Sequence, residues 1–113
     1  MISPTLGNEL AYRQGIALSF KSDIASQQQA FQTFKSLADS GISKAQMKTA
    51  DAYRFGKGVP KDFTAALNYY RLAATDAQYL EIVSQKLSAM AKEGWVPSVS
   101  DYFRYTPPSN RRA

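Results

Sequence analysis

The side chains that most often perform acid–base and nucleophilic chemistry are missing from this sequence. Its 113 residues include no cysteine and no histidine. Disulfides, zinc–thiolate sites, thiol nucleophiles and serine–histidine pairs are therefore excluded. Carboxylates, lysines, serines and tyrosines remain as the candidate catalytic groups.

The carboxylates are not arranged as a catalytic pair. Asp51 lies four residues before Phe55 and eleven before Asp62, while Glu81 and Lys86 belong to no recognisable motif. General acid–base catalysis needs titratable groups placed within hydrogen-bonding reach of one substrate. The sequence thus predicts a protein that is not an enzyme and has no catalytic residue, cofactor or metal site.

A glycine–lysine–glycine turn is the next candidate for chemistry, because glycine-rich loops bind phosphate. A Walker loop requires G-x-x-x-x-G-K-[ST] after a strand. The segment "GKGVPKD" has neither that spacing nor a strand before it. Glycine accepts a positive φ at little cost, so Gly56 and Gly58 are predicted to turn the chain between two helices. Asp62 is well placed to cap the second of them.

The chain is basic, with a formal net charge of +5 and a pI of about 9.6. Much of the excess lies in one middle segment, at Lys44, Lys48, Arg54, Lys57 and Lys61. Such a segment can attract nucleic acid or an acidic protein surface, or form a solvated helix face. Base-stacking aromatics beside the lysines are not evident, so nucleic-acid binding is kept as the alternative.

Helical periodicity dominates the remaining pattern, and no alternating stretch predicts a strand. Helices are expected after Asn8, from about Gln27 to Gly41, after Ser43 as a cap, from Asp62 to about Ala74, and from Thr75 to Gly94. No apolar run approaches a membrane-spanning length, and the first residues do not resemble a signal peptide. We expect a single soluble domain without a membrane span, cytoplasmic or periplasmic.

The helices recur with a spacing. "AFQTFKSLADSG" at Ala30 aligns with "ALNYYRLAATDA" at Ala66, 36 residues later. A helix-pair period of this size is typical of an α-solenoid, in which each pair buries its face on the next. The predicted fold is therefore all-α: a short α-solenoid of about two antiparallel helix pairs, with a C-terminal capping helix and a tail.

One stretch resembles a known family. The segment "AQMKTADAYRFGKGVPKDFTAALNYYRLAA" is similar to the Sel-one-like repeat, a relative of the tetratricopeptide repeat. The matching residues are Ala45, Tyr53, Gly56, Gly58, Val59, Asp62, Ala66, Tyr69, Tyr70, Ala73 and Ala74. The sequence departs from the pattern at Thr49 and Ala50, where leucine and glycine are usual. The resemblance implies a degenerate repeat over 9–41, a Sel-one-like repeat over 42–76, a capping helix over 77–94 and a tail over 95–113.

The resemblance also implies a function. Proteins of this family are protein–protein adaptors, common in bacterial secretion, envelope and signalling assemblies. On that layout the first helix of each pair lines a concave, partner-binding face. The implied partner-binding residues are Tyr12, Ile16, Phe20, Lys44, Met47, Asp51, Arg54, Phe55, Tyr79, Val83 and Lys86.

The expected partner is a protein that presents a peptide, a helix or an acidic segment. The narrower expectations are an adaptor, an immunity or chaperone-like partner of a secreted protein, and a subunit of an envelope or secretion complex. We expect a monomer when unbound, with the tail covering the last helix, and a hetero-complex in function.

Overall fold

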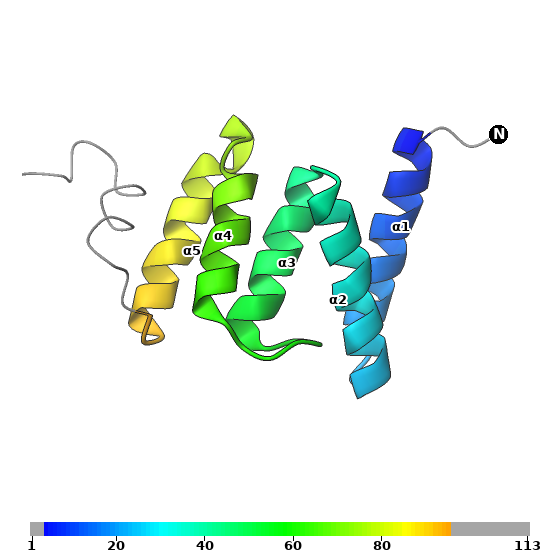
Figure 1. Ribbon diagram of the computed structural model, residues 1–113, viewed down its shortest axis with the longest axis horizontal. Helices are drawn as coiled ribbons and strands as arrows, with labels where there is room; N and C mark the ends of the chain where they lie inside the picture. The colour runs from blue at the N-terminus through cyan, green and yellow to red at the C-terminus, as the bar shows by residue number, and fades with distance from the viewer. Residues whose placement is uncertain (1–3, 96–113) are drawn as a thin grey trace, which may run out of the picture.

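Over its described residues the chain folds into five α-helices and one short 3-10 turn, in agreement with the predicted all-α fold. A computed structural model describes residues 4–95, and among these there is no strand. The helices are α1 (Pro4–Ser19), α2 (Ile24–Asp39), α3 (Ser43–Phe55), α4 (Phe63–Ala73) and α5 (Leu80–Lys92), with η1 (Ala77–Tyr79) before α5. Each helix runs antiparallel to the one before it (Figure 1).

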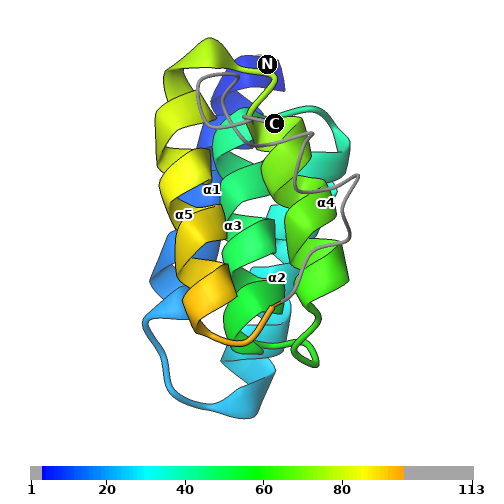
Figure 2. The same ribbon diagram turned by 90° about the vertical axis from the view of Figure 1, so that its left-hand side faces the viewer.

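The helices form two layers, as in a short solenoid. Viewed along the row, α1, α3 and α5 lie on one side and α2 and α4 on the other (Figure 2). Each helix packs on its neighbours in chain order. Within the described range, no helix has the length and apolar character needed to cross a bilayer.

Two of the predicted helix starts are wrong. Asn8 does not cap α1, because this helix already begins at Pro4. Proline is favoured at a first helical position, where a backbone amide hydrogen would have no partner within the helix. Ser43 is the first residue of α3, after an Ile42 cap that makes no side-chain hydrogen bond. The helix expected from about Gln27 begins earlier, at Ile24, because the Asp23 carboxylate caps it by accepting a hydrogen bond from the Ser26 amide at 2.9 Å.

The predicted helix ends at Gly41 and Gly56 are confirmed. Gly41 has a φ of +93°. Its amide donates to the Ala38 carbonyl and the Ile42 amide donates to the Leu37 carbonyl, which satisfies two carbonyls at the end of α2. Gly56 has a φ of +72° and its amide donates to the Ala52 carbonyl.

The turn between α3 and α4 is fixed at both ends and against a third helix. The Asp62 amide donates to the Tyr53 carbonyl at 2.8 Å, and the Asp62 side chain caps α4 by accepting from the Ala65 amide at 3.0 Å. Gly58 has a φ of +75°, and a Cβ there would lie 2.2 Å from the Gln27 carbonyl oxygen. The turn therefore packs directly on the backbone at the start of α2.

Small residues lie where helices approach closely. Ala50 and Ala66, on α3 and α4, are both fully buried. Gly15 of α1 faces the Phe34 ring of α2, and an added Cβ would lie 2.8 Å from it. The aromatic side chains fill the wider spaces: Tyr70 is fully buried, and Tyr53 contacts both Phe31 and Tyr69.

The last helix closes the core. Val83, Leu87 and Met90 of α5 are buried against α3 and α4, whereas Leu80, the first residue of the same helix, is 56% exposed. Trp95 packs against this core. The predicted return of the tail onto α5 falls on residues 96–113, outside the described residues.

Candidate functional site

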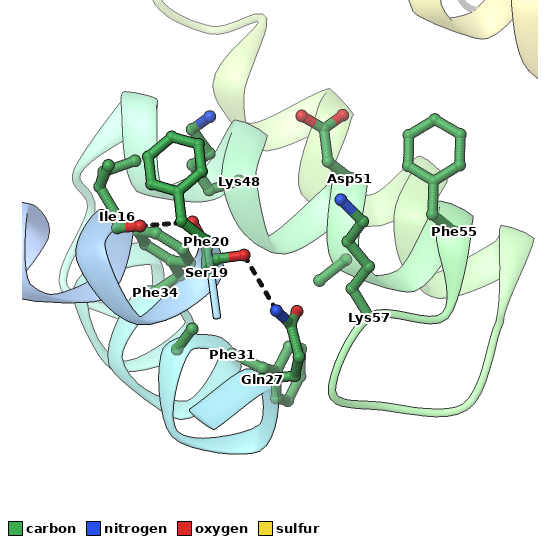
Figure 3. A pocket seen from close by; sticks show the side chains of 12 residues that line it. Ile16, Ser19, Phe20, Gln27, Phe31, Phe34, Lys48, Asp51, Phe55 and Lys57 are labelled. Atoms are coloured by element: carbon green, nitrogen blue, oxygen red, sulfur yellow. Dashed lines mark hydrogen bonds between the residues drawn. The ribbon is translucent and has the colours of Figure 1, made fainter. Parts of the chain in front are cut away.

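A groove opens between α1 and α3, with α2 as its floor; we call it the α1/α3 groove (Figure 3). Its volume is about 260 Å³. The lining residues are Ile16, Ser19 and Phe20 from α1, Gln27, Ala30, Phe31 and Phe34 from α2, Lys48, Asp51, Ala52 and Phe55 from α3, and Lys57 from the turn.

The spacing of these residues explains why they meet. Each helix contributes positions three or four residues apart, which lie on one face of an α-helix. On α3 these are Lys48, Asp51, Ala52 and Phe55. Each of the three helices therefore presents one row of side chains to the α1/α3 groove.

Two exposed phenylalanines flank the groove. Phe20 is 85% exposed and Phe55 is 52% exposed, and they stand on opposite sides of the opening (Figure 3). The floor beneath them is apolar and buried, at Ala30, Phe31 and Phe34. Covering this apolar floor and its exposed aromatic edges with a partner would remove apolar area from water, which is favourable.

Gln27 holds the closed end of the groove together. Its side-chain amide donates to the Ser19 carbonyl at 2.9 Å and also to the Lys21 carbonyl. These bonds satisfy carbonyls at the end of α1, which lack partners within the helix. They fix the end of α1, and with it Phe20, relative to α2.

The charge of the groove is positive on balance. Asp51 is already engaged, because it accepts a hydrogen bond from the Tyr70 hydroxyl and forms an ion pair with Lys86 at 3.1 Å. Burial, and next the Asp51 charge, raise the pKa of Tyr70, so this hydroxyl remains a donor. Within residues 4–95 neither Lys48 nor Lys57 forms an ion pair.

Four of the residues expected to bind a partner line the groove: Ile16, Phe20, Asp51 and Phe55. Lys86 does not line the groove, but its ammonium group pairs with Asp51, which does. Two others, Tyr12 and Lys44, lie farther along the α1–α3 contact. Lys44 forms an ion pair with Glu9 at 2.7 Å and lies 4.3 Å from the centre of the Tyr12 ring, which itself packs on Phe34.

The other expected residues are committed to the fold. Val83 is 2% exposed, so it contributes packing and no contact area. Arg54 is 8% exposed, and its guanidinium donates to both carboxylate oxygens of Glu93, at 3.0 and 2.5 Å. Met47 and Tyr79 are partly buried against the same core. Because the Arg54 side chain is buried and Glu93 already accepts two of its five N–H donors, little of its guanidinium can reach a carboxylate outside the chain.

Lys48 and Lys57 are groove residues that the expected set omits. Both belong to the basic middle segment of the sequence. The position of Lys48, three residues before Asp51 and seven before Phe55, places it on their helical face. Lys57 gives no such signal, because its approach to the groove depends on how the turn packs against α2.

Comparison with family models, with curated proteins and with solved structures finds no match for the chain. Over the described part of the chain, no group of three or more carboxylates is placed to hold a metal ion.

Proposed function

We propose that this protein is a non-enzymatic protein-interaction module of the Sel-one-like repeat type, an adaptor that binds its partner on the layer formed by α1, α3 and α5. One observation carries the proposal: the α1/α3 groove joins a buried apolar floor to two exposed phenylalanines. Exposed apolar side chains gathered around one groove mark interaction sites more often than apolar side chains scattered singly over a surface. Aromatic side chains are also enriched at the centres of protein interfaces.

The two-layer arrangement supports this proposal. In stacked helix pairs each helix contacts only its neighbours, so one layer can present an extended surface without cost to the core. Here the inward faces of α2, α3, α4 and α5 form the core, while the α1 and α3 stripes line the groove.

Site-specific photo-cross-linking tests the proposal. A photoreactive phenylalanine analogue placed at Phe20, in cells of the native source, should cross-link one protein at high yield. The matched control carries the analogue at Asn68, which is exposed on α4 in the other layer. Equal cross-linking from both positions, or cross-links to nucleic acid alone, would contradict the proposal.

A further inference from the structure

We propose that the α1/α3 groove takes a peptide segment in which one large apolar side chain is flanked by carboxylates. The inference rests on the proposed function and adds the chemistry of the partner. The apolar side chain lies between Phe20 and Phe55, and the carboxylates meet Lys48 and Lys57.

The size of the groove sets the size of the anchor. Its volume of about 260 Å³ lies below the roughly 300–1,000 Å³ of pockets that enclose whole ligands. One or two side chains fill it, and the rest of the segment stays on the surface. Phe20, 85% exposed, gains most from being covered, because burial of apolar area is the main favourable term in association.

The charge of the groove selects the flanking residues. Asp51 is matched by Lys86 at 3.1 Å and by the Tyr70 hydroxyl, which leaves the positive charges of Lys48 and Lys57 uncompensated at the rim. Lys48 lies on the α3 wall, and the Lys57 side chain extends from the turn toward the same wall (Figure 3). Carboxylates on the partner would complement both and would raise the association rate.

The same charge argument decides against the C-terminal part of this chain as the occupant. Residues 96–113 contain aromatic side chains, but also three arginines (Arg104, Arg111 and Arg112) against one aspartate (Asp101). A basic segment beside Lys48 and Lys57 would be repelled. The occupant is therefore an acidic segment of another protein.

Selection from a phage-displayed library of random short peptides, with the full chain as bait, tests this chemistry. The enriched peptides should share one large apolar residue next to aspartates or glutamates. Their affinity for the full chain, measured by fluorescence polarisation, should fall about tenfold in Phe20→Ala and about tenfold in Lys48→Glu. It should also fall as salt is raised, because the flanking contacts are between charges.

Two exposed residues outside the groove supply matched controls. Leu72 of α4, in the other layer, is 46% exposed, so Leu72→Ala removes exposed apolar area without touching the groove lining. Lys92→Glu reverses an exposed lysine on α5. Both variants should leave the affinity within about twofold of the parent chain.

The outcomes separate the inference from the proposed function. Enriched peptides that are basic, or whose binding survives Phe20→Ala and Lys48→Glu, would overturn the inference while leaving a protein-binding role intact. A library that yields no binder would also overturn it. The photo-cross-linking experiment judges the proposed function independently, because it needs no assumption about the partner's sequence.

Discussion

Substitution of Gly58 tests whether the α3–α4 turn packs on the backbone of α2. A side chain there would cost free energy twice, once for the positive φ and once for the contact with Gln27. Replacement by alanine places a side chain at a φ of +75°, which costs about 1–2 kcal/mol for a residue with a Cβ. The new Cβ would also lie 2.2 Å from the Gln27 carbonyl oxygen and 2.6 Å from its carbon. These are backbone atoms and cannot rotate away, so the turn must move off α2.

The cost of the clash is that of overpacking, about 1–3 kcal/mol. We therefore expect Gly58→Ala to lower the free energy of unfolding by about 2–5 kcal/mol in urea titrations. Gly56→Ala is the matched control, because its φ of +72° is nearly the same while its added Cβ would meet Lys61 at an ordinary 3.4 Å. It should cost only about 1–2 kcal/mol. Equal losses in the two variants would refute the contact between the turn and α2.

Three further predictions concern the core and its polar contacts. Ala66→Leu should lower the free energy of unfolding by about 1–3 kcal/mol in urea titrations, since Ala66 is fully buried between packed helices; an unchanged value would mean that this crossing has spare room. Tyr70→Phe should cost about 1–2 kcal/mol by the same measurement, because its hydroxyl donates to the Asp51 carboxylate beside the core. Tyr69→Phe, which removes an exposed bond to Asp39, should cost clearly less. Arg54 holds the pKa of Glu93 below its ordinary 4.5, so the pair stabilises the fold at neutral pH and that stabilisation is lost as the pH falls through the lowered pKa. An acid titration followed by the fluorescence of Trp95, the single tryptophan, should show a change as Glu93 is protonated. The same titration of Glu93→Gln should lack that change.

The second helix pair was the most predictable part of the fold. Its glycines, its Asp62 cap and its small residues are local requirements, each met by residues close together in the sequence. Positive φ at Gly56 and Gly58 and full burial of Ala66 and Tyr70 follow from that pattern. Of the two wrong caps, Asn8 lies inside α1, and Ser43 is the first residue of α3, whose cap position is held by Ile42 without a side-chain hydrogen bond.

The surface was less predictable, because contacts distant in sequence decide which side chains are free. Arg54 was expected to contact a partner, yet it pairs with Glu93, 39 residues away. Periodicity places Arg54 on α3 but says nothing of the carboxylate that α5 brings to it. The α1/α3 groove likewise depends on three helices at once, so the sequence predicted four of its residues without indicating that they enclose a groove.

The first helix pair lacks the glycine turn that marks the second, and a different set of contacts holds its connection. In the second pair, the turn at Gly56 and Gly58 packs on the preceding pair, with Gly58 against the Gln27 backbone. The connection within the first pair is fixed by a side chain instead, because the Gln27 side-chain amide donates to the Ser19 and Lys21 carbonyls. This short connection, from Ser19 to Ile24, leaves Phe20 exposed at the end of α1. The second pair thus holds its connection with glycine backbone packed on a helix, whereas the first pair holds its connection with the Gln27 amide and so keeps Phe20 at the edge of the α1/α3 groove.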